Sequence, residues 1–264
     1  LFIIKPDMNS GTRGITVVKE ETEGDKLKAA IETCSSLSRN GETVIEEYIP
    51  IAPEAVIEGE IFIHNGEVLW DGLFRSIRSS KAPMIPMTYV FPLVEEREPK
   101  LRESLKKVLQ AAGIVHGEYN IEACFVGDEP FIIEINPRQG GNDLPRYVQE
   151  HCGIDYFKLL VTTAVGDDEY WNNLREYRRQ NIRITHHMLY PRKNGQFRGV
   201  SIADEIKNCI CCTQIYVTEG DEIKKATDGS QSIGYVDLVI DDEQEQGKIS
   251  KKLEDLIKIE VEVG

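Results

Sequence analysis

The chain has 264 residues, of which 41% are hydrophobic and 29% charged, a balance typical of a globular protein with a sizeable core. Its 31 Lys and Arg face 45 Asp and Glu, so the formal net charge is −14. This acidity argues against a nucleic-acid-binding surface, because phosphate contacts need clustered cations. We also expect no membrane span and no signal peptide. The opening Leu1-Phe2-Ile3-Ile4 is a buried-strand sequence without Met, which indicates the middle of a longer protein.

Taken in chain order, the first half alternates apolar strands with polar turns. Strands are predicted at 1–5, 15–18, 44–49, 55–63, 67–77, 115–126 and 130–136. Helices are predicted at 25–38, 99–112, 144–152 and 155–165. Residues 79–92 contain three prolines and no clear period, so they are predicted to form a loop, and 170–181 a linker. The remainder, 182–263, is predicted to hold short strands and one amphipathic helix at 244–257.

This order of elements predicts an α+β fold with a boundary near residue 180. Residues 1–180 would form the main core, and residues 181–264 a small β-rich C-terminal lobe.

Two predicted strands joined by a turn at 127–129 carry polar residues that share a face. Because side chains alternate along a strand, Glu134 and Asn136 point the same way, and a three-residue turn places Glu122 opposite Glu134. Two facing carboxylates repel each other unless a cation lies between them. Two carboxylates and an amide oxygen form a ligand set suited to Mg²⁺. Arg138 would lie on the same face if the chain stays extended, where its planar fork could hold a carboxylate or phosphate.

A simpler interpretation exists for either acid alone, as part of a solvated strand face or as a carboxylate capped by Arg138. However, Glu134 stands within Phe-Ile-Ile-Glu-Ile, where an unpaired charge would be costly to bury. The set as a whole therefore favours a metal site.

A second polar segment, residues 9–14, lies between two predicted strands and offers hydroxyl groups, two glycines and Arg13. Backbone N–H groups of such a loop can surround phosphate oxygens. The segment lacks the P-loop lysine and is followed by a strand, so taken alone it is typical of an ordinary glycine-rich hairpin. Lys5, at the end of the preceding strand, could reach a phosphate or simply be a charge at a strand end.

Other candidate residues carry weaker signals. Arg75 and Arg78 could bind a substrate carboxylate or lie on an exposed strand. His186 and His187 are neighbours in a predicted strand, so only one should point inward, and a packed histidine is the simplest interpretation. The six cysteines show no CxxC spacing and are expected to be reduced, mostly buried thiols.

In their order along the chain, these segments resemble the ATP-grasp superfamily over residues 1 to about 166. The resemblance rests on Ile4-Lys5-Pro6 with the loop through Gly14, the segment 44–49 with Glu54, Glu122, and the run Glu134-Ile135-Asn136-Pro137-Arg138-Gln139-Gly140-Gly141. The Glu-x-Asn-x-Arg element with a Glu twelve residues upstream is its specific part. A weaker resemblance, to carboxylate–amine ligases of this superfamily, covers 217–223 and 234–235. Carbamoyl-phosphate synthase and biotin carboxylase are related types.

The resemblance implies an ATP-grasp fold of antiparallel sheets with helices, and it assigns roles by position. Lys5 would contact the phosphate and the adenine edge, and the loop with Ser10, Gly11, Thr12 and Gly14 would cover the phosphates. The segment Glu46, Glu47, Tyr48 and Ile49 would line the adenine, and Glu54 would bind the ribose. Glu122, Glu134 and Asn136 would hold Mg²⁺, with Mn²⁺ as an alternative ion. Arg138 would be the catalytic residue that steadies an acyl phosphate.

Such enzymes activate a carboxylate with ATP, and an amine then displaces phosphate. We therefore expect a cytoplasmic ATP- and Mg²⁺-dependent ligase for small-molecule carboxylate and amine substrates, such as an amino acid or peptide. No nucleic-acid or membrane partner is expected, and a homodimer is one assembly to consider. Two alternatives stay open: a bicarbonate-activating enzyme of the carbamoyl-phosphate synthase or biotin carboxylase type, and a nucleotide-binding fragment without catalysis.

The chain departs from the family pattern in two places. The family's earlier lysine-bearing strand and N-terminal α/β domain are missing before Leu1, so we expect an N-terminally truncated core. The stretch at 50–53 before Glu54 is also longer than the usual Pro-Gly-x-Glu.

Overall fold

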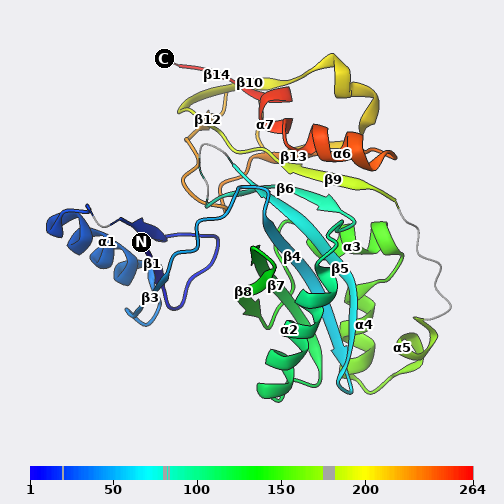
Figure 1. The fold of residues 1–264 in the computed structure, drawn as a ribbon. Helices are drawn as coiled ribbons and strands as arrows, with labels where there is room; N and C mark the ends of the chain where they lie inside the picture. The colour runs from blue at the N-terminus through cyan, green and yellow to red at the C-terminus, as the bar shows by residue number, and fades with distance from the viewer. Residues whose placement is uncertain (20, 80–81, 83, 175–181, 264) are drawn as a thin grey trace.

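The computed structural model describes the chain apart from residues 20, 80–81, 83, 175–181 and 264, and it confirms an α+β architecture. An N-terminal lobe, shown in blue in Figure 1, stands beside the rest of the molecule. It is an antiparallel sheet in the order β2-β1-β3 with one helix. Its elements are β1 (Phe2–Pro6), β2 (Thr16–Val18), α1 (Gly24–Leu37) and β3 (Thr43–Glu47). Ile4, Val18 and Cys34 form a small core between the helix and the sheet.

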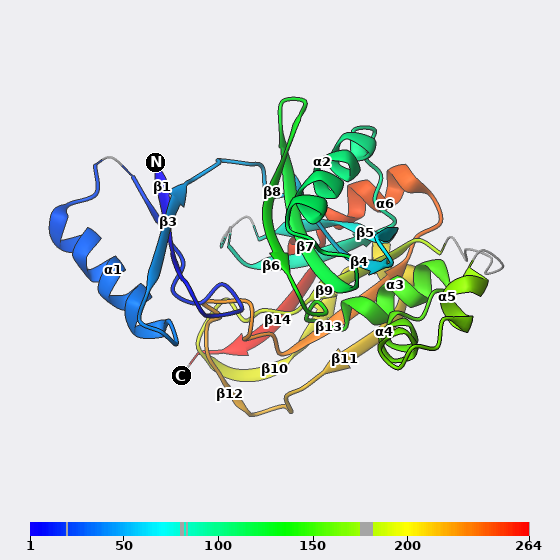
Figure 2. The same ribbon diagram turned by 90° about the horizontal axis from the view of Figure 1, so that it is seen from below.

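The largest sheet has eight antiparallel strands in the order β11-β13-β9-β6-β5-β4-β7-β8. They are β4 (Val56–His64), β5 (Glu67–Arg78), β6 (Pro86–Phe91), β7 (Gly117–Val126), β8 (Glu129–Asn136), β9 (Ile184–Met188), β11 (Ile210–Ile215) and β13 (Gly234–Val239). The helices between β6 and β9 are α2 (Glu98–Ala111), α3 (Leu144–Cys152), α4 (Tyr156–Ala164) and α5 (Glu169–Asn173). Seen from below, the β7–β8 hairpin stands at the open edge of this sheet (Figure 2).

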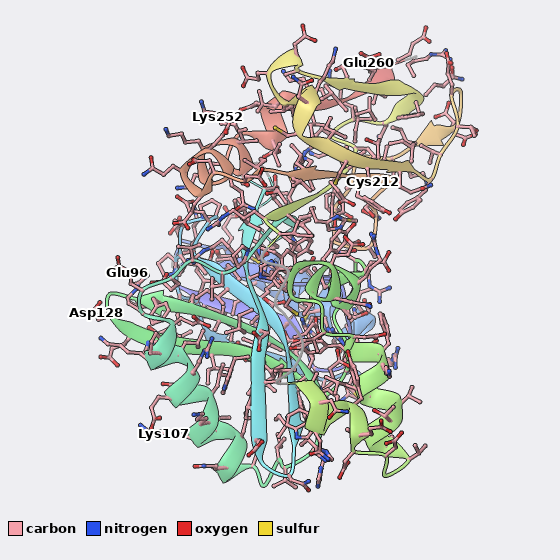
Figure 3. The ribbon with its side chains drawn as sticks, turned by 90° about the vertical axis from the view of Figure 1, so that its right-hand side faces the viewer. Glu96, Lys107, Asp128, Cys212, Lys252 and Glu260 are labelled. Carbon is pink, nitrogen blue, oxygen red and sulfur yellow. The ribbon has the colours of Figure 1, made fainter. Side chains whose placement is uncertain are left out.

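Alternation along β4 explains how the sheet is covered on both faces. Ile57, Ile61 and Ile63 point towards α2, whose Leu101 and Leu105 pack against them. The same core includes apolar side chains of β7, and α2, which carries Lys107, runs beside the hairpin whose turn carries Asp128 (Figure 3). The even-numbered residues of β4 point to the opposite face, where Phe62 packs on the α3 and α4 side. That second face is apolar near α3 and α4 and polar farther along the strand.

The C-terminal residues complete the large sheet and form a third sheet in the order β12-β10-β14. This smaller sheet comprises β10 (Gly195–Ile202), β12 (Glu222–Ile223) and β14 (Ile257–Glu262), accompanied by a 3₁₀ helix (Asp204–Cys209), α6 (Glu243–Ser250) and α7 (Leu253–Leu256). Leu189, Phe197, Val236 and Leu253 belong to the core of this region. None of the helices in the described part of the chain is long and apolar enough to cross a membrane.

The predicted boundary near residue 180 lies outside the described residues, but strands from both sides of it belong to the same sheet. β9, which follows the boundary, pairs with β6, so that Tyr89 lies opposite His186. Strand pairing thus connects the two predicted parts. The division into 1–180 and 181–264 stays a prediction about folding units.

Several predicted elements were wrong in detail. Residues 79–92 are not all loop, because Met87–Phe91 are buried within β6 between β5 and β9. Pro86 begins that strand, where a missing N–H is tolerated. The predicted linker begins with residues of α5, and its positions 175–181 lie outside the described residues. The predicted helix at 244–257 is two helices, because α6 ends at Ser250 and α7 begins at Leu253.

The histidines differ from expectation, and the cysteines are free thiols as expected but only half of them are buried. His186 and His187 are both buried, because the sheet is covered on both faces; His186 contacts Asp237 and His187 contacts Thr88. Burial lowers the pKa of His187 to about 3, so it stays neutral. All six cysteines are free, and three of them are buried (Cys34, Cys124 and Cys152), whereas Cys211 and Cys212 are exposed.

Candidate nucleotide and metal site

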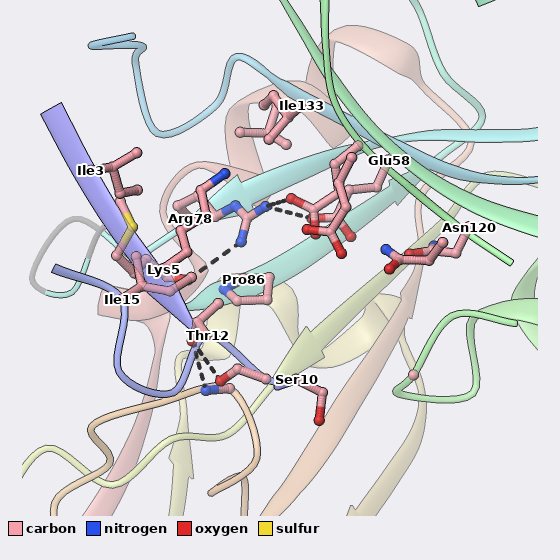
Figure 4. Close-up of a pocket in the computed structure, with 18 of the residues that line it drawn as sticks. Ile3, Lys5, Ser10, Thr12, Ile15, Glu58, Arg78, Pro86, Asn120 and Ile133 are labelled. Carbon is pink, nitrogen blue, oxygen red and sulfur yellow. Dashed lines mark hydrogen bonds and ion pairs between the residues drawn. The ribbon is translucent and has the colours of Figure 1, made fainter. Parts of the chain in front are cut away.

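A cavity of about 950 Å³ lies between the N-terminal lobe, the polar face of the large sheet and the C-terminal lobe. One wall is formed by β1, β3 and the loop between β1 and β2, with Lys5 and Thr12 facing the cavity. The opposite wall comes from β4, β5, β7 and β8, and includes Glu58, Arg78 and Asn120 (Figure 4). The volume lies within the range typical of small-molecule sites.

The sheet wall carries two rows of polar side chains that run across three neighbouring strands. In the first row, Glu58 of β4 pairs with Glu122 of β7, which pairs with Glu134 of β8. In the second row, two residues along each strand, Glu60, Asn120 and Asn136 are paired in the same way. Pairing across antiparallel strands brings side chains within about 5 Å, so the rows concentrate hydrogen-bonding and charged groups on one face.

The predicted pairing of Glu122 with Glu134 is present, but for a different reason from the one expected. The hairpin turn has two residues, because Val126 pairs with Glu129, and this alone would misalign the two acids. A bulge restores the register, since Ala123 pairs with Ile132 and Glu122 with Glu134, leaving Ile133 without a paired residue. Ile133 lines the cavity and is 36% exposed. Glu134 is itself exposed, so the expected cost of burying it in an apolar strand was wrong.

Arg78 joins the first row through an ion triad. Its Nη2 donates to Glu58 Oε1 at 2.9 Å and to Glu122 Oε2 at 2.8 Å. Burial raises the pKa of Glu58 to about 7, with a further contribution from Glu122 that Arg78 opposes. Burial alone would lower the pKa of Arg78, but Glu122 and Glu58 raise it above its usual value. Arg75, the other candidate arginine, donates instead to Glu95 and lies away from the cavity lining.

The loop between β1 and β2 faces the sheet wall and touches the C-terminal lobe. The N–H of Gly229 donates to Gly11 O at 3.0 Å and to Thr12 Oγ1 at 3.3 Å. Thr12 has a φ of 61°, which is unusual for a β-branched residue. Ser10, Gly11 and Thr12 line the cavity, whereas Gly14, at a φ of 78°, packs against Leu37 and Pro6.

Most of the other residues predicted to bind the nucleotide line the cavity, and one lies beside it. Lys5 lines the cavity and forms an ion pair with Glu46. The lining also includes Glu46, Glu47, Tyr48 and Ile49. Glu54 is not part of the lining, although Pro53 and Val56 on either side of it are.

The predicted metal ligands Glu122, Glu134 and Asn136 all line the cavity, as does Arg138. Across the part of the chain that the structure describes, no three His, Cys, Asp or Glu side chains converge on one point. Two carboxylates and an amide oxygen are hard donors, and Mg²⁺ commonly completes such a set with phosphate oxygens and water. The donor chemistry therefore fits Mg²⁺ bound together with a nucleotide.

Arg138 reaches the cavity from a bend, because its N–H donates to Asn136 O at 2.8 Å. The condition of an extended chain, under which Arg138 was placed on the same face as Glu134, is therefore not met. Backbone hydrogen bonding to β7 nevertheless continues past the end of β8, since Asn120 N–H donates to Arg138 O at 3.0 Å.

Sequence reasoning missed several lining residues, among them Glu58, Asn120, Tyr89, Asn142, Gly229 and Ser230. Glu58 and Glu60 had a detectable signal, because two acids with a spacing of two interrupt an apolar strand in the same way as Glu134 and Asn136 do. Tyr89, whose hydroxyl accepts a hydrogen bond from Asn142 at 2.8 Å, was missed because residues 79–92 were predicted to form a loop. Gly229 and Ser230 had no such signal, because only folding brings them to the cavity.

A family model described as "ATP-grasp domain" matches residues 1–145, which include every element of the sheet wall and of the N-terminal lobe. The chain belongs to the ATP-grasp family. Among curated ATP-grasp relatives, the large chain of carbamoyl phosphate synthase from Thermus thermophilus is 24% identical over 171 residues, covering 62% of this chain and 16% of that protein. The uncharacterized protein y4rH of Sinorhizobium fredii is 25% identical over 237 residues, covering 89% of this chain and 48% of that protein.

The solved structures support the same ATP-grasp fold. The crystal structure of an L-amino acid ligase from Bacillus licheniformis is similar with a TM-score of 0.72 and 18% identity, over 99% of this chain and 64% of that chain. The present chain thus spans about half the length of the Sinorhizobium relative and under two thirds of the Bacillus ligase.

Proposed function

We propose that this chain forms the ATP-binding and carboxylate-activating core of an ATP- and Mg²⁺-dependent ligase that joins a carboxylate to an amine. The observation that carries the proposal is the cavity wall on which Glu122 faces Glu134, with Asn136 and Arg138 beside them and the glycine-rich loop opposite. The family membership supports ATP as the nucleotide.

The two walls have distinct proposed roles toward the nucleotide. Lys5 and the N–H groups of the Ser10–Gly14 loop would bind phosphate oxygens, and the backbone of residues 46–49 would bind the adenine. The apolar side chains of Phe131 and Ile133, both partly exposed in the cavity, offer a surface for the base. Glu54, just outside the lining, would reach the ribose.

Glu122, Glu134 and Asn136 would hold Mg²⁺, which would neutralise charge on the transferred phosphate. Arg138 would orient the substrate carboxylate. It would also stabilise the charge that develops as the carboxylate attacks the γ-phosphorus of ATP. With Mg²⁺ on the phosphate and Arg138 on the carboxylate, the repulsion between these two anions would be offset and the reacting atoms would be held close together.

Groups on the sheet wall next to Glu122 favour an amino acid or peptide as substrate. Arg78 and Glu58 place a cation and an anion together, and Tyr89 and Asn142 add a hydroxyl and an amide. This mixture suits a ligand with both an ammonium and a carboxylate group. The Bacillus structure of similar fold is that of an L-amino acid ligase. A homodimer, a cytoplasmic location and the use of Mn²⁺ stay predictions.

Calorimetry with a non-hydrolysable ATP analogue tests the nucleotide and metal parts of this proposal. We expect the wild-type chain to bind the analogue with Mg²⁺ and the Glu134→Ala variant to lose at least about tenfold in Mg²⁺-dependent affinity. Glu129→Ala, at the exposed start of the same strand, is the matched control and should bind as the wild type does. Equal affinities of all three proteins would contradict the metal assignment.

A screen of amino acids, small carboxylates and bicarbonate for ATP-dependent phosphate release tests the reaction. Release that needs an amino acid, and increases with a second amine, supports the ligase. Release with bicarbonate alone would favour the carbamoyl-phosphate synthase or biotin carboxylase type of reaction. Mg²⁺-nucleotide binding without release from any carboxylate would favour a binding module.

A further inference from the structure

The turn that carries Arg138 is held on the sheet by polar side chains buried beneath it. Gly140 N–H donates to Glu60 Oε1 at 3.0 Å, and Gln139 Nε2 donates to Glu118 Oε2 at 2.8 Å. Glu60 has no exposed surface, and Glu118 is 5% exposed. Neither carboxylate lines the cavity, so the turn lies between them and the proposed substrates.

Glu60 also sets the orientation of the amide of Asn120. Asn120 Nδ2 donates to Glu60 Oε1 at 2.9 Å, and this oxygen acts as an acceptor because it also accepts from Gly140 N–H. The amide nitrogen must therefore face Glu60, which leaves Asn120 Oδ1 to accept from Arg138 Nη1 at 3.4 Å. A chain of contacts thus runs from Glu60 through Asn120 to the guanidinium.

The backbone of the turn approaches Glu60 so closely that a side chain at position 140 would displace the carboxylate. A Cβ at Gly140 would lie 2.2 Å from Glu60 Oε1 and 3.0 Å from Asn120 Nδ2. The absent side chain at 140 and the carboxylate at 60 are therefore complementary, and together they determine how far the turn lies above the sheet.

Keeping a carboxylate at position 60 is unfavourable for folding alone. Among the described residues Glu60 Oε2 has no hydrogen-bond partner, and burial raises the pKa of Glu60 to about 7. An apolar side chain would avoid this desolvation cost. The geometry that Glu60 imposes on the turn gives a reason for its presence.

We propose that Glu60 is a positioning residue, which fixes the turn 138–140 and thereby aims the guanidinium of Arg138 at the face that carries Glu122 and Glu134. This inference rests on the proposed function, because it assigns Arg138 to the substrate carboxylate. Glu60 itself touches no substrate.

The experiment compares Glu60→Ala, Glu60→Gln and Glu95→Ala in the full chain. Gln keeps the Oε1 acceptor for Gly140 and Asn120, whereas Ala removes it. Glu95 is another largely buried carboxylate with arginine partners, outside the cavity lining, and controls for a general loss of stability. With the best carboxylate from the screen, we expect Glu60→Ala to lower kcat by roughly ten- to hundredfold, because small displacements of a positioning group have effects of this size.

Three features distinguish positioning from simple damage. The affinity for the Mg²⁺-bound ATP analogue should stay within about threefold of wild type in Glu60→Ala, and Glu60→Gln should restore most of kcat. In an Arg138→Ala background, Glu60→Ala should lower kcat by less than about twofold further, since the two residues would act as one unit. Multiplicative losses, or a fall in nucleotide affinity as large as the fall in kcat, would overturn the proposal.

A structural measurement keeps this test separate from the proposed reaction. Hydrogen exchange of a peptide covering residues 138–141 should become faster in Glu60→Ala but not in Glu60→Gln or Glu95→Ala. If no carboxylate supports phosphate release, the proposed function fails while this exchange result still reports on the turn. Unchanged exchange in Glu60→Ala would overturn the positioning role whatever the activity.

Discussion

The sheet wall of the cavity, formed by β4, β5, β7 and β8, and the loop wall, formed by β1, β3 and the loop between β1 and β2, present their polar groups in different ways. On the sheet wall, Glu58, Glu122 and Glu134 are placed by continuous strand pairing within an eight-stranded sheet whose other face packs against α2. The N-terminal lobe has a small core around Ile4 and Cys34, and its loop meets the C-terminal lobe at Gly229.

This difference suits the two tasks that we propose. Metal and carboxylate chemistry needs fixed distances, which buried strand pairing provides. Covering phosphates needs a loop that can admit a nucleotide and then close, and a few hydrogen bonds of about 1 kcal/mol each can be broken and re-formed. The following predictions separate the two walls, beginning with the largest effect.

Removing Arg78 should damage the sheet wall most. Arg78→Met leaves Glu58 and Glu122 without their shared cation, and we expect a loss of about 3–5 kcal/mol in the free energy of unfolding at pH 8, measured in urea. The matched variant Arg75→Met, on the same strand, should lose clearly less, because Glu95 keeps Arg97 as a second partner. The double variant Arg78→Met with Glu58→Gln should recover part of the loss. Equal losses for the two single variants would contradict the ion triad.

The buried acids should make stability depend on pH. The pKa of Glu60 is raised by burial to about 7, so the folded chain binds its proton more tightly than the unfolded chain does. Stability is then highest below about pH 4.5 for this group and falls as pH rises through about 7, by up to roughly 3 kcal/mol. Urea unfolding at pH 5 and pH 8 should show a smaller decrease in Glu60→Gln than in wild type. Glu129→Gln should keep the wild-type slope; a wild-type slope in Glu60→Gln would argue against the raised pKa.

On the loop wall, the backbone donor at Gly229 should matter for binding more than for folding. Gly229→Pro removes the N–H that donates to Gly11 and Thr12. We expect the affinity for the Mg²⁺-bound ATP analogue to fall by about fivefold, which corresponds to the free energy of one hydrogen bond. Gly229→Ala keeps the N–H and its Cβ would meet its nearest atom at 3.6 Å, so it should bind normally. Similar affinities for the Pro and Ala variants would show that this contact does not hold the loop over the nucleotide.

The smallest effect should come from the partly exposed ion pair of the N-terminal lobe. Glu46→Gln should change the free energy of unfolding by less than about 0.5 kcal/mol, since exposed ion pairs contribute little. Analogue affinity should stay unchanged, because position 46 is proposed to contact adenine through its backbone. A fall in affinity beyond about threefold would assign the nucleotide contact to the side chain instead.

Much of the fold could be predicted from local patterns. The hairpin turn at Asn65-Gly66, the helix with Leu101 and Leu105 on one face, and the alternation of Glu134 with Asn136 are each set by neighbouring residues. The strand β6 could not be predicted, because Pro86 and the nearby Pro83 and Pro92 are typical of a loop. Only the neighbouring strands β5 and β9 make Met87–Phe91 a buried strand. The acidic pair was predicted through a wrong turn length, and the bulge at Ile133 restored it.

By itself, the sequence determined the chemistry of the site: two acids and an amide at strand spacing, an arginine after them, and a small-residue loop with a lysine before it. Tertiary structure decided which distant groups join that chemistry. Strand pairing brought Glu58 and Arg78 to Glu122, and folding of the C-terminal lobe brought Gly229 to the loop. The physical reason is that alternation and turn preferences act over a few residues, whereas a cavity wall depends on registers and contacts between residues more than two hundred positions apart.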